Sequence, residues 1–177
     1  DPERDLALIQ YTGGTTGTPK GAALTHANLS VNAQQLLAVD PDPQRPERLL
    51  AVLPLFHIFA NSCVLNRTLL RGGELVMLPR FDPAEALAAI ARRRVTDFAG
   101  VPAMFQALID HPAFARTDLG SLQRAYSGGA AMASELKDRF EAATGVRILE
   151  GYGLTETAGV VSANPIDGAE KSRSAGH

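Results

Sequence analysis

Short apolar runs recur along the chain at fairly regular intervals. Each run has three to six residues, and the starts of most runs lie about 22 to 27 residues apart. Runs of this length, bounded by polar or turn-forming residues, are typical of β-strands. We therefore predict strands at residues 6–11, 49–53, 75–78, 98–101, 125–127 and 148–151.

Patterns with helical periodicity fill the segments between most of these runs. The clearest places Leu87, Ile90 and Ala91 on one face, with Asp82 as an N-cap and Pro83 at the first helical position. Three further helices are predicted from apolar faces. The first follows Thr25 and has the face Leu29, Ala33, Leu36 and Leu37. The second ends before Pro112 and has the face Phe105, Leu108 and Ile109, and the third ends before Gly145 and has the face Leu136, Phe140 and Ala143.

Strands that alternate with helices at this spacing predict an α/β fold, with a mostly parallel sheet that helices cover on both faces. Ligands of such sheets bind beyond the carboxyl ends of the strands. The proline-rich segment 40–47 is expected to be an exposed connector. The loops expected to form one site are residues 12–21, 54–59, 128–132 and 152–157.

The loop after the first run is rich in small residues and ends in a lysine. Gly13, Gly14 and Gly17 allow main-chain N–H groups to approach an anion, and Lys20 offers a mobile ammonium group. Hydroxyl donors come from Thr12, Thr15, Thr16 and Thr18. The loop lacks the GxxxxGK[ST] pattern of NTPases, so we predict a different phosphate-binding loop; the alternative is an ordinary Gly/Thr turn without a ligand.

Composition and charge mainly exclude classes of binding partner. With 17 basic and 19 acidic residues and no long run of either sign, the chain has no basic surface of the kind that binds nucleic acid, and we expect small-molecule partners. No apolar stretch is long enough to span a bilayer, which leaves peripheral membrane contact open, and we expect a cytoplasmic protein. Cys63 is the single cysteine, and we expect it to be a small buried hydrophobe.

Four stretches together resemble the signature segments of the adenylate-forming superfamily, which includes acyl-CoA synthetases, luciferases and peptide-synthetase adenylation domains. In chain order they are QYTGGTTGTPKG, LPLFHIFA, YSGGAAM and GYGLTET. The resemblance covers residues 10–157, and within the superfamily the chain is most similar to bacterial medium- and long-chain fatty acyl-CoA synthetases. Many members have serine where Gly13 stands.

The resemblance implies the chemistry and the residues that perform it. Such enzymes join a carboxylate to the α-phosphate of ATP, release pyrophosphate, and then transfer the acyl group to coenzyme A. Thr155 would donate to the α-phosphate, Glu156 would hold Mg²⁺, and Tyr152 would stack on adenine. The β- and γ-phosphates are assigned to Thr15, Thr16, Gly17 and Lys20, room for the base to Gly128, Gly129 and Ala130, and the border of the acyl substrate to Phe56, His57 and Gly151.

Two alternatives remain open. His57, beside Phe56 and Phe59, also suits a core histidine, and GYGLTET also suits a turn that Thr155 caps.

We expect residues 1–157 to form the nucleotide- and acyl-binding subdomain and residues 158–177 to be a tail that leads into further domains, which would carry the ribose-binding aspartate and a catalytic lysine. The chain is then part of an acyl-CoA synthetase, or else a non-catalytic nucleotide-binding or assembly module, or an adenylation domain for another carboxylate or an amino acid.

Overall fold

A six-stranded sheet forms the centre of the computed structural model, which describes residues 1–12, 17–38, 40, 42, 44–167 and 174. The strand order is β4-β3-β5-β6-β7-β8, and every neighbouring pair is parallel except β7 and β8. The strands are β3 (Arg48–Ala51), β4 (Glu74–Met77), β5 (Asp97–Gly100), β6 (Arg124–Ser127), β7 (Ile148–Leu154) and β8 (Gly159–Ala163).

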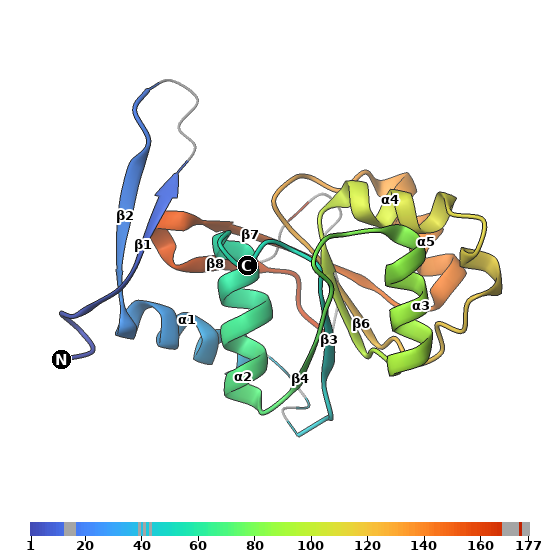
Figure 1. Cartoon of the computed structure of the whole chain (residues 1–177), viewed down its shortest axis with the longest axis horizontal. Coiled ribbons are helices and arrows are strands. Elements are labelled where there is room, and N and C mark those ends of the chain that lie inside the picture. The colour runs from blue at the N-terminus through green and yellow to red at the C-terminus, as the bar shows by residue number, and fades with distance from the viewer. Residues whose placement is uncertain (13–16, 39, 41, 43, 168–173, 175–177) are drawn as a thin grey trace.

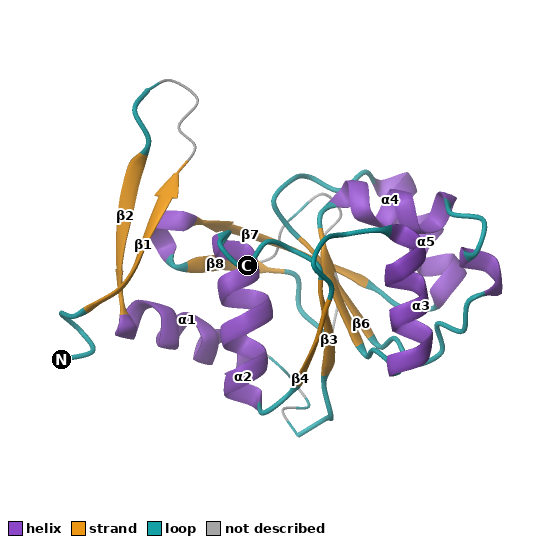
Figure 2. Cartoon of the chain, in the orientation of Figure 1, coloured by secondary structure: helices purple, strands orange, loops and turns teal. Residues whose placement is uncertain are grey.

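Helices cover both faces of this sheet, as the sequence predicts (Figures 1 and 2). One face carries α3 (Pro83–Arg93), α4 (Pro102–Asp110) and α5 (Ser134–Thr144), and the other carries α1 (His26–Ala38), the π-helix η1 (Ala60–Asn66) and α2 (Arg67–Arg71). Two short 3₁₀ turns complete the list, η2 (Phe114–Arg116) and η3 (Thr155–Thr157).

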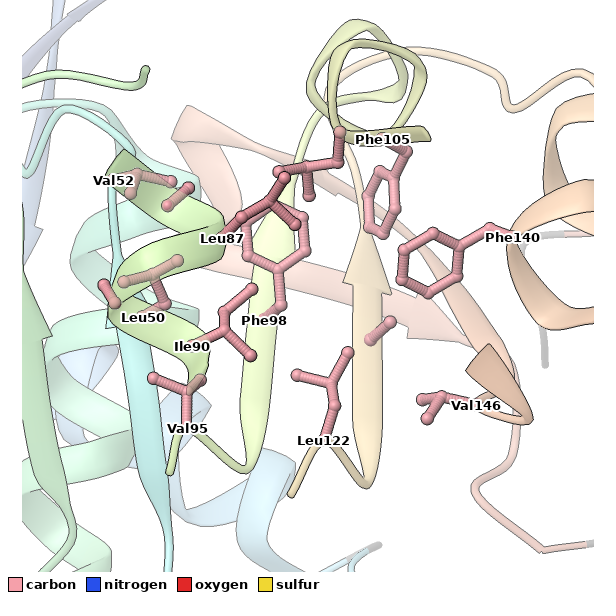
Figure 3. Close-up of a cluster of buried hydrophobic side chains, with 14 of the residues drawn as sticks. Leu50, Val52, Leu87, Ile90, Val95, Phe98, Phe105, Leu122, Phe140 and Val146 are labelled. Carbon is pink, nitrogen blue, oxygen red and sulfur yellow. The ribbon is translucent and has the colours of Figure 1, made fainter. Parts of the chain in front are cut away.

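The two faces of the sheet use alternate residues of β3 for their cores. Leu50 belongs to the cluster beneath α3, α4 and α5, whereas Leu49 belongs to the cluster beneath η1. In the larger cluster Phe105 packs edge to face against Phe98 and Phe140, with ring centroids 5.0 and 5.1 Å apart (Figure 3). This alternation explains why a strand buried on both faces reads as a continuous apolar run.

The helix signals in the sequence are confirmed where capping residues specify them. The Asp82 side chain accepts a hydrogen bond from the Glu85 N–H at 2.9 Å, and α3 begins at Pro83. Helix α5 ends at Gly145, whose φ of +72° is the left-handed conformation that glycine adopts without strain.

The first predicted strand is not part of the main sheet. Strand β1 (Leu6–Thr12) pairs with β2 (Lys20–Thr25) in an antiparallel hairpin that projects from the rest of the molecule (Figure 1). We expected residues 6–11 to form a buried strand of the helix-covered sheet, but Leu6 and Ile9 are 56% and 55% exposed, so this expectation is wrong. A parallel partner requires a long crossover connection, whereas β2 follows β1 closely enough for a hairpin.

The segment expected to be an exposed connector contains buried charges instead. Asp40 is 5% exposed and accepts hydrogen bonds from Arg71 and Arg124, both at 2.5 Å. Burial alone would raise the pKa of Asp40, but hydrogen bonds from Arg124, from the Asp42 N–H and from Arg71 outweigh burial and lower the pKa to about 2. The prolines did mark a loop, but Asp40 and Glu47 of this loop are buried, whereas Asp42 is exposed.

A second acidic residue of this segment joins the same cluster. Glu47 forms an ion pair with Arg67 at 2.9 Å and accepts a hydrogen bond from Thr68 at 2.8 Å. Arg45 binds both carboxylate oxygens of Asp97, at 2.8 and 2.9 Å. Because β5 and β6 begin at Asp97 and Arg124, this charge cluster lies at the amino ends of the parallel strands.

Strand β8 was missed in the sequence. Residues 159–163 fall within the predicted tail, yet they pair with β7, with Leu154 opposite Gly159 and Gly151 opposite Ala163. The run GVVSA is short and its residues are mostly half-buried, so its apolar signal is weak. The end of the predicted tail, residues 168–173 and 175–177, lies outside the described residues.

Candidate active site

A cleft of about 910 Å³ lies at the carboxyl ends of β6 and β7, where the fold predicts a ligand. Its walls come from the loop that follows β6, from the start of α5 and from β7. Among the residues that line it are Gly129, Ala130, Lys137, Glu150, Gly151 and Tyr152. Four of these six were predicted site residues.

Glycines allow the loop after β6 to form one wall of this cleft. Gly129 has a φ of +80°, which a residue with a side chain rarely adopts. Gly128 is buried, and a Cβ there would lie only 3.2 Å from the Phe59 ring. The absence of a side chain therefore lets the turn of residues 54–59 pack directly against the cleft wall.

The turn of residues 54–59 exposes Phe56 and His57, the two site residues that were predicted there. His57 N–H donates to Pro54 O at 2.9 Å, and His57 Nδ1 accepts from the Phe59 N–H at 3.2 Å. The His57 side chain is exposed and Phe56 is 79% exposed. His57 is therefore not a core histidine in this structure, whereas the half-buried Phe59 packs against the core and beside Gly128.

Strand β7 carries the aromatic ring that the sequence singled out. Tyr152 is 52% exposed and lines the cleft together with Gly151 and Gly153. The ring is thus available to a planar ligand, and Gly129 and Ala130 border the same space. This combination leaves room for an aromatic base beside an aromatic side chain.

The η3 turn lies directly after β7 and carries the two predicted phosphate and metal residues. Thr155 is half-buried and Glu156 is exposed. Glu156 lines a second hollow of about 330 Å³, between η3 and α1, rather than the cleft itself. The Thr157 hydroxyl accepts from the Leu154 N–H at 3.2 Å, which closes the turn.

The hairpin positions the ends of the predicted phosphate loop opposite each other. Thr12 pairs with Lys20, and the Thr12 hydroxyl donates to Lys20 O at 3.3 Å. Lys20 and Gly17 are exposed, and neither lines the cleft. Gly13, Gly14, Thr15 and Thr16 lie outside the described residues.

The sequence reasoning missed a charged pair in the cleft wall. Lys137 Nζ of α5 lies 3.9 Å from Glu150 Oε1 of β7, and Glu150 Oε2 accepts from the Met132 N–H at 3.4 Å. Glu150 therefore ties the loop that follows β6 to β7. Its place directly before the GYG stretch was an available signal, whereas a lysine on a helix normally predicts a solvated side chain.

Other chemistry finds little support among the residues that the structure describes. Cys63 is buried, and burial raises its pKa to about 12, which disfavours a reactive thiolate and agrees with the expected small hydrophobe. Among the residues that the structure describes, no group of three or more His, Cys, Asp and Glu side chains is arranged to hold a metal ion. Nor does any helix there have the length and apolar character needed to cross a bilayer.

An α/β domain with a glycine-bordered cleft at the carboxyl ends of parallel strands is typical of nucleotide-binding enzymes. Residues 1–177 match the family described as AMP-binding enzyme, and the chain belongs to that family. The superfamily expected from the four signature stretches is thereby confirmed.

Relatives and solved structures agree on this class. The long-chain-fatty-acid–CoA ligase of Bacillus subtilis (strain 168) is 42% identical over 99% of this chain, and a feruloyl-CoA synthase of an Amycolatopsis species is 43% identical over 97%. This chain spans 32% and 35% of their lengths, or about a third.

Among solved structures, the ATP-bound RpMatB-BxBclM chimera B3 superposes with a TM-score of 0.87 at 36% identity, over 97% of this chain and 33% of its own. The inhibitor-bound N-terminal domain of FACL13 from Mycobacterium tuberculosis superposes with a TM-score of 0.83 at 33% identity, over 90% of this chain and 39% of its own. The fold is therefore that of the N-terminal domains of adenylate-forming enzymes.

Proposed function

We propose that this chain is the nucleotide- and acyl-binding part of an ATP-dependent acyl-CoA ligase. The observation that carries the proposal is the cleft between Gly129 and Tyr152, in a chain that matches the AMP-binding family throughout. Its volume of about 910 Å³ lies in the range of small-molecule sites. The half-exposed Tyr152 ring suits stacking against adenine.

The phosphates are assigned to the η3 turn and the hairpin. Thr155 has a hydroxyl donor for the α-phosphate, and Lys20 has a cation on a long side chain that can follow phosphate oxygens. Glu156 is a single exposed carboxylate, which fits Mg²⁺ because this ion is often bound by one or two carboxylates together with substrate phosphates. Mg²⁺ would neutralise charge on the phosphates.

The reaction has two steps. A carboxylate oxygen of the acid forms a bond to the α-phosphorus, and the bond from that phosphorus to the bridging oxygen breaks, so pyrophosphate leaves. The thiolate of coenzyme A then bonds to the acyl carbon, AMP leaves with its oxygen, and the thiol proton passes to water. Both steps bring anions together, so charge neutralisation by Lys20 and positioning of the phosphate by the Thr155 hydroxyl dominate catalysis.

The acid is proposed to be a fatty acid. Phe56 and His57 lie on the turn that packs against the cleft wall, and one similar relative is a long-chain-fatty-acid–CoA ligase. The similar feruloyl-CoA synthase favours an aromatic acid as the second candidate. A panel of acids, scored by pyrophosphate release in a longer protein that contains this chain, decides between them; selective use of an α-amino acid would exclude both.

The nucleotide site is tested on the chain itself. Calorimetry should show binding of ATP with a Kd on the order of 1 mM, which corresponds to only about 4 kcal/mol. Tyr152→Ala should weaken this binding at least about fivefold, because base–aromatic stacking contributes roughly 1–3 kcal/mol. Met77→Ala is the matched control, since Met77 is exposed on β4 at the other end of the sheet. Equal affinity of the Tyr152→Ala variant and the unchanged chain would contradict the proposed site.

A further inference from the structure

Asn32 is a buried polar residue in the middle of α1. It is 5% exposed, and a buried amide without partners would cost about 1–3 kcal/mol. Its Nδ2 donates to Val160 O at 2.8 Å, and its Oδ1 lies 3.3 Å from the Val160 N–H and 2.5 Å from Ser62 Oγ, both of which donate to it. The side chain therefore bonds both backbone groups of Val160.

These hydrogen bonds occupy backbone groups of β8 that a further strand would otherwise pair with. Val160 belongs to β8, which is the last strand of the sheet and pairs with β7 on its other side. An amide side chain has a donor and an acceptor, as a peptide group has, so Asn32 satisfies the outer edge of β8 at one residue. Helix α1 is thereby hydrogen-bonded to β8 at Val160.

The backbone at Gly159 packs closely against this contact. Gly159 has a φ of +132°, and a Cβ there would lie 2.5 Å from Ser62 Oγ and 2.7 Å from Asn32 Oδ1. Gly159 comes two residues after the end of η3, which finishes at Thr157. The contact with Asn32 therefore fixes one end of the η3 turn.

The other end of η3 is closed by its own side chain. The Thr157 hydroxyl lies 2.9 Å from both Leu154 O and Gly159 O, so its one proton is shared between these two acceptors. Thr155 and Glu156 are consequently held on a turn with both ends fixed. Ser62 belongs to η1, which begins three residues after His57, so the turn of residues 54–59 is linked to the same contact.

We propose that Asn32 is a positioning residue, which holds the η3 turn and with it the Thr155 hydroxyl and the Glu156 carboxylate. The inference rests on the proposed function, but it assigns Asn32 no contact with substrate. Displacement of a reacting or binding group by about 1 Å is enough to lower activity strongly. Loss of the Asn32 amide should therefore weaken contacts to phosphate and leave the cleft around Tyr152 unchanged.

The experiment compares two ligands on the 177-residue chain. Asn32→Leu keeps the size of the side chain without its amide, Ser62→Ala removes one hydrogen bond, and Gln34→Leu is the control on the exposed side of α1. Calorimetry measures the affinity of each variant for adenosine and for ATP with Mg²⁺. We expect Asn32→Leu to lose about tenfold in ATP affinity, Ser62→Ala less, and no variant to change adenosine affinity.

A second measurement does not depend on any nucleotide. Amide hydrogen exchange at residues 157–161 should become faster in Asn32→Leu and stay unchanged in Gln34→Leu, because only the first variant releases β8. Equal losses for adenosine and ATP would indicate general loosening and overturn the proposal, as would unchanged ATP affinity in both site variants. If Asn32→Leu does not fold, Ser62→Ala decides by the same criteria.

Failure of the proposed function has a different signature. An unchanged chain that binds neither adenosine nor ATP would refute the nucleotide site. In that event hydrogen exchange alone decides the role of Asn32: faster exchange at residues 157–161 supports it as the residue that holds η3, and unchanged exchange overturns it.

Discussion

At the scale of single residues, the structure separates side chains that stabilise the fold from those offered to a ligand. Asp40 is buried among arginines, whereas Tyr152 and Glu156 project into open space. A buried ion pair that loses one partner leaves an uncompensated charge, whereas an exposed side chain contributes little to stability. Substitution of Asp40 should therefore lower the stability of the fold, whereas substitution of Tyr152 or Glu156 should weaken ligand binding and leave stability nearly unchanged.

Acid should destabilise the chain through Asp40. The pKa of about 2 lies below the ordinary value of 3.8, so the stabilisation is complete above about pH 4 and is lost as the pH falls toward 2. We expect the free energy of unfolding, from urea titrations, to fall by about 2 kcal/mol over this range from Asp40 alone.

Replacement of this carboxylate gives a sharper test. Asp40→Asn should lower the free energy of unfolding at pH 7 by about 3–5 kcal/mol, because Arg124 loses its carboxylate partner and Arg71 keeps only Glu47, at 3.7 Å. Asp118→Asn is the control, since its pair with Arg94 is exposed and contributes at most about 1 kcal/mol. Equal effects of the two substitutions would contradict a special role of Asp40.

Glu156→Gln should leave folding unchanged and remove the response to magnesium. Glu156 is exposed, so we expect the free energy of unfolding to change by less than about 0.5 kcal/mol. Mg²⁺ should strengthen ATP binding in the unchanged chain and not in the variant, measured by calorimetry at two Mg²⁺ concentrations. A variant that keeps the full Mg²⁺ response would remove Glu156 from the metal site.

Residues with a local signal were predictable from sequence, and residues with distant partners were not. Gly129 and Tyr152 stand in short motifs, and both line the cleft. Asn32 bonds Val160, which is 128 positions away, and Lys137 pairs with Glu150 across two elements. Because no spacing rule joins such residues, only the tertiary structure shows why these polar side chains are buried.

At the scale of elements, the parallel strands were predictable because burial on both faces demands uninterrupted apolar runs. The hairpin strand β1 also has an apolar run, but its residues are exposed or only half-buried and its partner is its sequence neighbour. The helical segment 60–71, formed by η1 and α2, was missed, since it follows directly on an apolar stretch that contains Pro54 and His57. Apolar content alone does not distinguish these three environments.

The close pairing of β7 and β8 predicts a severe effect of a single methyl group. A Cβ at Gly153 would lie 2.3 Å from Gly159 O, a backbone atom that cannot move independently. Gly153→Ala should therefore lower the free energy of unfolding by about 2 kcal/mol or more. Gly17→Ala is the control, because nothing described lies within 4 Å of its Cβ position. Similar thermal midpoints for the two variants would show that β8 can shift without cost.

At the scale of the whole molecule, the chain provides one part of the proposed reaction. It spans about a third of the relatives that it matches, and its cleft is open. Adenylation needs the carboxylate and the α-phosphate within about 3 Å of each other, in a site that excludes water. The binding surfaces described here do not enclose such a space.

The isolated 177 residues should accordingly bind nucleotide without turning it over. We expect no acyl-CoA above background at any fatty-acid chain length, in an assay with ATP, Mg²⁺ and coenzyme A that detects thioester by mass spectrometry. A longer protein that contains this chain is the positive control. Substantial thioester formation by the 177 residues alone would show that the remaining machinery is dispensable.

The charge cluster of Asp40, Glu47 and their arginines has a consequence for how this domain can evolve. It ties the amino ends of the parallel strands, while the cleft occupies their carboxyl ends. Substitutions in the cleft loops thus leave these buried ion pairs untouched. In a family with this arrangement, the cleft loops can change to bind a different carboxylic acid substrate with little loss of stability. The similar relatives named for long-chain fatty acids and for feruloyl-CoA are consistent with such changes.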